Sequence, residues 1–326
     1  MGYPSFLSWL LSFMLLTAAS ICRVQGSTSS SLPSAAATSP IRSWDPSWAA
    51  SCAQGTVVAV SYRTTKTSNA EESHGLVLLT RSTQSPTPTT TKEKDSAANR
   101  AVQVDGLRVL PVAMGSVVAS DVSRRWTPLG ATALCCMTGL ASDVDYLSRA
   151  LQKQADHHQT VYEASHHLAT LKLVRALASM LQGATQWQGG RPYGVQAVLI
   201  GLDQQSLGIF SLDPSGGFRH WGAATAIGRG ATQVRKHLYE SLSQQDMTVV
   251  TTSGAEAALE HAMRACAKAT KEASLDLNAE HYDAIVVRTG KRNGPLRVAT
   301  VDPQQLRECQ DAINKEMVDS PTKKQL

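Results

Sequence analysis

Two pairs of amphipathic helices separate three groups of apolar strands in this chain, and this order constrains the fold more than any single motif. Apolar residues recur with the period of an α-helix at 142–158, 164–182, 231–243 and 253–273. Short β-branched or aliphatic runs predict strands at 55–62, 74–81, 130–139, 193–203, 207–213, 217–228 and 282–290. The links between consecutive strands are short, which favours antiparallel sheets. Paired helices can cover the outer faces of two packed sheets, so the order predicts an α+β fold: a four-layer αββα sandwich.

The predicted sandwich occupies one domain, from residue 49 to residue 290. A Thr/Pro/Ser-rich tract at 83–100 is expected to be a loop inserted into this domain. Residues 27–48 are rich in Ser, Ala, Pro and Thr and are expected to form a flexible linker. Residues 291–326 are expected to form a polar C-terminal tail with only a weak helical stretch.

Residues 1–26 are a signal-like apolar segment. The run 6–20, "FLSWLLSFMLLTAAS", ends in small residues, which is the layout of a secretory signal peptide. The run is short for a membrane helix, so we expect no stable membrane span. It lacks a basic beginning, since the first Arg is Arg23. Two interpretations stay open: a signal for a secretory or organellar route, and an N-terminal extension without that role.

Composition excludes several classes of function. The hydrophobic content is 42% and the net charge of +5 is spread along the chain, without a basic stripe that contains aromatic residues. We therefore expect no nucleic-acid partner.

No C-x-x-C occurs among the six cysteines, and Cys135 and Cys136 are expected to be buried on opposite faces of one strand. Four histidines form two adjacent pairs, which cannot share a helix face: His157, His158, His166 and His167. We expect no metal and no cofactor.

Residues 213–230, "DPSGGFRHWGAATAIGRG", raise the question of a phosphate-binding loop. A dinucleotide loop needs G-x-G-x-x-G between a strand and a helix, and here no third glycine follows Gly228 and Gly230 at that spacing. The glycines are therefore interpreted as turn residues. Trp221 and Ile227 are expected to pack between layers.

Three motifs resemble the α-type subunits of the proteasome. They are "MTGLASDVDYLSRALQKQADHH", "GRPYGVQAVLIGLD" and "DPSGGFRHWGAATAIGRG", which follow one another in the order of that family, within a similarity from about Gly55 to Gly290. The resemblance implies the N-terminal-nucleophile hydrolase fold, in agreement with the predicted order of elements. It also implies a non-catalytic subunit of the heptameric outer ring of the core particle, which gates the access of substrate and docks activators in ubiquitin-dependent degradation.

The implied partners are other α- and β-type subunits, proteasome activators and unfolded polypeptide, in the cytoplasm and nucleus. The helix at 142–158 would lie at subunit contacts. Asp143 fits the N-terminal charge of that helix, and Arg191 is expected to pair with an acid that the sequence does not identify.

The alternative is a β-type threonine peptidase with Thr56 as the processed N-terminal nucleophile. Gly55-Thr56 provides the required dipeptide, and the amine of such a threonine acts as base. That site needs a carboxylate at the end of the second strand, where this chain has Arg81. We therefore expect no catalytic residue and no enzyme, with Thr56 as the weak alternative. A third hypothesis is an exported paralogue outside the particle, because a signal-like N-terminus is foreign to a cytosolic and nuclear particle. Residues 39–54 also lack the family's N-terminal signature, which bears on gating and ring assembly.

Overall fold

A computed structural model of the chain describes residues 45–46, 49–50, 55–64, 73–82, 102–112, 126–161, 170–186, 191–203, 206–243, 254–273, 281–289 and 295–319. All of them belong to the second of two compact units, Trp44–Leu326. The signal-like segment 1–26 and the inserted loop 83–100 lie outside the described residues, as does the linker 27–48 apart from residues 45 and 46.

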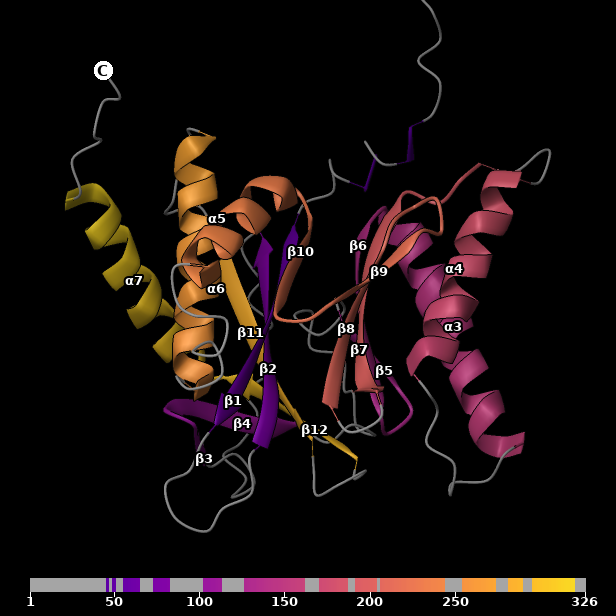
Figure 1. Cartoon of the computed structure of the whole chain (residues 1–326), viewed down its shortest axis with the longest axis horizontal. Coiled ribbons are helices and arrows are strands. Elements are labelled where there is room, and N and C mark those ends of the chain that lie inside the picture. Colours follow the sequence, from indigo (N-terminus) through magenta and orange to yellow (C-terminus); the bar gives the residue numbers. More distant parts are fainter. Residues whose placement is uncertain are drawn as a thin grey trace, which may run out of the picture. The chain divides into compact units, whose positions relative to one another are not determined.

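Two antiparallel sheets form the centre of this unit (Figure 1). Within the described residues, the larger sheet has the order β10-β1-β2-β11-β12-β4-β3 and the smaller sheet the order β5-β6-β7-β8-β9. The larger sheet contains β10 (Ala224–Gly228), β1 (Thr56–Thr64), β2 (Ser73–Ser82), β11 (His281–Thr289), β12 (Leu296–Val301), β4 (Leu107–Val112) and β3 (Val102–Val104). The smaller sheet contains β5 (Trp126–Leu129), β6 (Ala133–Gly139), β7 (Val195–Asp203), β8 (Ser206–Leu212) and β9 (Phe218–Trp221). Every pairing among these described strands is antiparallel, which confirms the prediction.

Helices cover the outer face of each sheet (Figure 1). The helices are α3 (Ala141–Val161), α4 (Thr170–Gln186), α5 (Ala231–Ser243), α6 (Gly254–Glu272) and α7 (Pro303–Asp319). Side chains of α3 and α4 share one buried cluster with the smaller sheet, and side chains of α5, α6 and α7 share another with the larger sheet. A third cluster fills the space between the sheets. The order of layers is therefore helix–sheet–sheet–helix, as predicted.

Strand β1 shows how the sequence builds these layers. Side chains alternate between the two faces of a strand. Val58 and Val60 belong to the cluster under the helices, whereas Val57 and Ala59 belong to the cluster between the sheets. Both faces are buried, so an uninterrupted apolar run is stable here.

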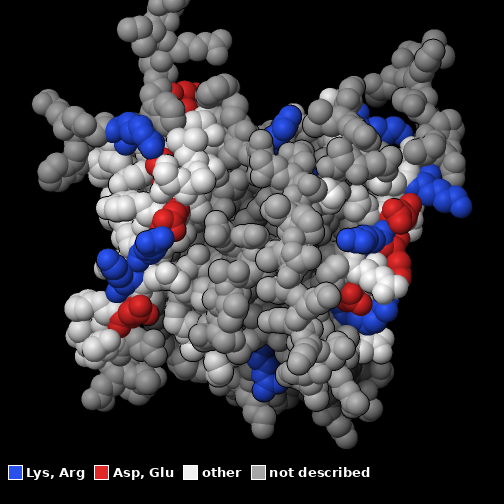
Figure 2. All heavy atoms as spheres, turned by 180° about the vertical axis from the view of Figure 1, so that it is seen from behind, with Lys and Arg blue, Asp and Glu red and all other residues white. Residues whose placement is uncertain are grey.

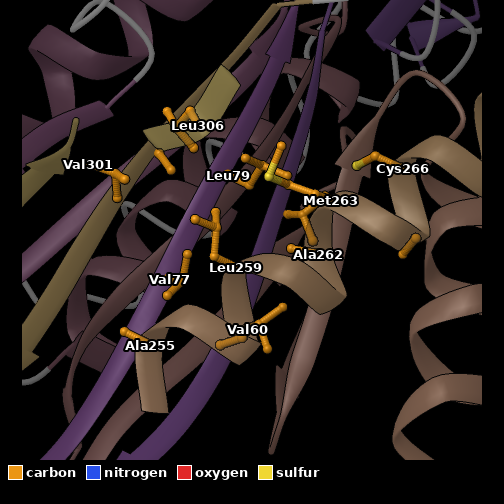
Figure 3. Close-up of a cluster of buried hydrophobic side chains, with 14 of the residues drawn as sticks. Val60, Val77, Leu79, Ala255, Leu259, Ala262, Met263, Cys266, Val301 and Leu306 are labelled. Carbon is orange, nitrogen blue, oxygen red and sulfur yellow. The ribbon is translucent and has the colours of Figure 1, made fainter. Parts of the chain in front are cut away.

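Helix α6 lies close against the larger sheet. Figure 3 shows Val60, Val77 and Leu79 of the strands directed toward Leu259 and Met263 of the helix. Much of the remaining buried face of α6 is alanine, and small side chains allow a close approach of helix and sheet. Leu259 is fully buried at this contact.

The predicted strand 217–228 is two strands in different sheets. β9 pairs with β8 in the smaller sheet, and β10 pairs with β1 in the larger sheet. Gly222 lies between them, and a Cβ atom at this position would meet no heavy atom within 4 Å. The run looks continuous because Trp221 and Ile227 both contact the cluster between the sheets, which confirms their predicted packing.

The predicted domain end at residue 290 and the polar tail 291–326 are corrected by the structure. β12 pairs with β11 and β4 inside the larger sheet. α7 buries Leu306, Ile313 and Met317, which lie on one helix face because they are spaced at multiples of a turn. The exposed face of α7 is polar, so the average composition of the segment conceals this apolar stripe. The folded domain therefore continues to residue 319, the last described residue.

Candidate functional site

The beginning of β1 is the position where the sequence places a candidate nucleophile. Thr56 lies opposite Gly228 of β10 and opposite Arg81 of β2 in the ladder. Its side chain is fully buried. The register therefore puts a cation, and not a carboxylate, beside the threonine.

The hydroxyl group of Thr56 is fully engaged in hydrogen bonds. It donates to the carbonyl oxygen of Arg229 at 2.7 Å. It accepts from Nε of Arg81 at 3.2 Å and from Nη2 of the same side chain at 2.9 Å. A hydroxyl has one proton and two lone pairs, so these three bonds use its complete capacity.

Arg81 joins four segments that are distant in the sequence. Its side chain, 6% exposed, also donates from Nη1 to the hydroxyl of Thr270 on α6 at 2.6 Å and from Nη2 to the carbonyl of Arg229 at 3.3 Å. The Thr270 hydroxyl donates its own hydrogen bond to the carbonyl of Cys266 at 2.9 Å. Burial of a cation is costly unless polar partners surround it, and here hydroxyl and carbonyl oxygens fill that role.

The glycines after β10 allow the chain to pass close to this site. Gly228 has φ +90°, and a Cβ atom there would collide with the carbonyl oxygen of Gly55. The same carbonyl accepts a hydrogen bond from the backbone N–H of Arg229 at 3.0 Å. Gly230 has φ +68° immediately before α5. Both glycines serve the turn and the close approach, as the sequence predicts.

A cavity of about 420 Å³ lies between the beginning of α5 and the end of α6, next to Arg81. Its described lining includes Arg81, Arg229, Gln233, Thr270 and Glu272. Neither this cavity nor the role of Thr270 is apparent from the sequence. The contact between Arg81 and Thr270 joins residues 189 positions apart, and no local pattern marks such a pair.

A second polar cluster fixes two of the family-like motifs to each other. Arg191 donates from Nη1 and Nη2 to the two carboxylate oxygens of Asp143 at 2.7 and 2.6 Å. The backbone N–H of Gly194 donates to the same carboxylate at 3.0 Å. Burial raises the pKa of Asp143, but the hydrogen bonds from Arg191 and Gly194 outweigh it and hold this pKa below its ordinary value. Asp143 is thus the acid that pairs with Arg191.

The histidines and cysteines considered as metal ligands form no metal site in the described part of the chain. His157 and His158 lie on α3, and His166 and His167 lie outside the described residues. No group of three or more His, Cys, Asp or Glu residues that could hold a metal ion occurs among the residues that the structure describes. Cys135 and Cys136 pack into clusters on opposite faces of the smaller sheet, as predicted for neighbours on one strand. Burial raises the pKa of the Cys135 thiol, which keeps it protonated.

The described surface gives two further observations about partners. On the face shown in Figure 2, Lys and Arg side chains lie next to Asp and Glu side chains on both flanks. Among the helices that the structure describes, none is long and apolar enough to cross a membrane.

Comparison with known proteins agrees with this geometry. The described domain has the α+β sandwich of the N-terminal-nucleophile hydrolases, with Arg81 beside Thr56 at the beginning of β1. The family model "Proteasome subunit" matches residues 105–277, more than half of the chain. The chain belongs to the proteasome subunit family.

Curated relatives of the chain are α-type members of that family. Proteasome subunit alpha type-2 of Dictyostelium discoideum is 32% identical over 105 residues, which cover 32% of this chain and 44% of that protein. The protein of the same name from Oryza sativa subsp. indica is 31% identical over 110 residues, 34% of this chain and 45% of its own. Proteasome subunit alpha of Methanococcus maripaludis is 31% identical over 155 residues, 47% of this chain and 54% of its own. The chain thus spans about half the length of the curated relatives it matches, and the predicted resemblance to α-type subunits is confirmed.

Proposed function

We propose that this chain is a non-catalytic α-type subunit of a proteasome core particle and that it occupies the outer ring. The similarity to α-type relatives supports the placement in the particle. The hydrogen bonds between Thr56 and Arg81 are the observation that carries the non-catalytic role.

An N-terminal threonine attacks a peptide carbonyl only if its hydroxyl proton can move to a base and its oxygen can reach the substrate. The proton of the Thr56 hydroxyl is directed to the carbonyl of Arg229, and both lone pairs are occupied by Arg81. A guanidinium group cannot accept a proton at physiological pH, so Arg81 cannot act as the base or as its orienting carboxylate. Full burial of Thr56 also separates its oxygen from a substrate.

In this role the partners are other α- and β-type subunits, and the ring gates the access of unfolded polypeptide and docks activators in ubiquitin-dependent degradation. The particle places the chain in the cytoplasm and nucleus. The helices α3 and α4 lie at contacts with neighbouring subunits. Residues 49–319 form the subunit domain, and residues 1–48 precede it as a signal-like segment and a linker.

Co-purification tests the proposal. The full chain, tagged at its C-terminus and expressed in its native cell, is isolated under non-denaturing conditions, and its partners are quantified by mass spectrometry. We expect the other α- and β-type subunits in equal amounts, with an untagged strain as control. Recovery of the chain without them, above all with an N-terminus between residues 20 and 27, would instead support the exported paralogue.

The same sample tests the peptidase alternative. A mature chain that begins at Thr56 would contradict the non-catalytic role. We expect a mature N-terminus upstream of Thr56 and peptide hydrolysis that is unchanged in particles carrying Thr56→Ala.

A further inference from the structure

The cavity beside Arg81 has the size and the lining of a site for a small ligand. Its volume of about 420 Å³ falls within the range of small-molecule pockets. Arg81 and Thr270 line it from below the surface, and both side chains are more than nine-tenths buried. Arg229 and Gln233 line it with exposed side chains. The buried Arg81 and Thr270 are already hydrogen-bonded to protein partners, so Arg81 contributes charge to the lining. The exposed hydrogen-bond donors are the side chains of Arg229 and Gln233.

The charge of the lining favours an anion. Two arginines face the cavity and Glu272 is the acid among its described lining residues. Oε1 of Glu272 lies 3.0 Å from Nε2 of His237 on α5, so this carboxylate lies against the imidazole ring of His237. Guanidinium groups match the geometry of oxyanions, to which they donate parallel hydrogen bonds. The first turn of α5 contains no acid, and its partial positive charge adds to the field of the arginines.

We propose that this cavity binds a small oxyanion of the phosphate class, either free phosphate or the phosphate group of a small metabolite. Arg229 and Arg81 supply the positive charge, and the Gln233 amide supplies a neutral donor. Binding here goes beyond the proposed subunit role, and it does not require assembly into a ring.

Arg229 is the residue to substitute, because its contacts with the fold are made by its backbone. Its N–H donates to Gly55, and its carbonyl accepts from Thr56 and Arg81. Arg229→Ala removes one cation from the cavity and retains these bonds. Arg307→Ala is the matched control, because Arg307 is an exposed arginine on α7 that is not among the described lining residues of the cavity.

The test is isothermal titration calorimetry, in which the purified full chain is titrated with inorganic phosphate and, separately, with adenosine monophosphate. Sodium chloride holds the ionic strength constant, so that general screening does not change during the titration. We expect saturable binding to one site, weakened at least about tenfold by Arg229→Ala, as for the loss of one charged hydrogen bond, and unchanged by Arg307→Ala. Tighter binding of the nucleotide identifies a phosphorylated metabolite as the ligand, and tighter binding of inorganic phosphate identifies the free ion.

Two results would contradict the proposed oxyanion site. The first is the lack of saturable binding of either compound, and the second is equal weakening by both substitutions, which would indicate an effect of net charge. Both are distinguishable from failure of the proposed subunit role, because that role is measured by co-purification and not by titration.

Discussion

Replacement of Thr56 by valine tests whether the hydrogen bonds between Thr56 and Arg81 stabilise the folded domain. Valine has nearly the same shape as threonine, so Thr56→Val removes the hydroxyl without opening a cavity. Two N–H groups of the buried Arg81 then lose their acceptor, and the carbonyl of Arg229 loses one of its donors. A hydrogen bond to a charged group contributes about 1.5–3 kcal/mol, and a buried donor without a partner costs a similar amount. We expect Thr56→Val to lower the free energy of unfolding by about 2–4 kcal/mol.

The contribution of the pair itself follows from a double-mutant cycle with Arg81→Met. With methionine at this position there is no guanidinium to leave unsatisfied, so Thr56→Val should cost less. The coupling energy is expected to be about 1.5–3 kcal/mol. Urea unfolding of the full chain, followed by tryptophan fluorescence, measures each of the four free energies.

A neighbouring threonine provides the control. Thr225 on β10 is fully buried, and its hydroxyl oxygen has no hydrogen-bond partner among the described residues. Thr225→Val should therefore be neutral or stabilising, although it makes the same chemical change in an adjacent strand. An equal decrease in the free energy of unfolding for Thr56→Val and Thr225→Val would refute this stabilising role of the Thr56–Arg81 hydrogen bonds. A coupling energy near zero would refute it as well.

Three other predictions concern the fold around the site. Leu259→Ala should reduce the free energy of unfolding by about 2–5 kcal/mol in urea titrations, because it empties a fully buried position under α6. Gly228→Ala should lower the melting temperature because φ is +90° and the added Cβ meets backbone, whereas Gly222→Ala, with open space, should not. The folded pKa of Asp143 lies below its ordinary 3.8, so its stabilisation is present above pH 3.8 and is lost as the pH falls through the folded pKa. The difference in unfolding free energy between wild type and Asp143→Asn should therefore be largest near pH 7 and shrink below pH 3.8.

Local patterns predicted the layers because each layer has its own period. β1 is apolar on both faces and lies between two buried clusters, and the apolar stripe of α4 packs on the smaller sheet. The three motifs predicted the family because they encode local geometry, such as the turn before α5. Here sequence and structure agree because the determining contacts lie within a few residues.

Three features could not be predicted in the same way. The change from the smaller to the larger sheet at Gly222 is not visible in the sequence, because residues before and after it contact the same buried cluster between the sheets. Strand β12 is a short apolar run next to a polar helix, and α7 is polar on average. Pairing of β12 with β11 and packing of α7 against α6 show that both elements belong to the domain. The Arg81–Thr270 contact depends on the complete sandwich, which brings the end of β2 beside α6.

The most direct test of the proposed subunit role is the mass and composition of the native complex that contains this chain. We predict a particle in which the chain is present in equal amount with other α- and β-type subunits and has a mature N-terminus upstream of Thr56. Isolation of the chain alone, or as a subunit whose first residue is Thr56, would contradict it.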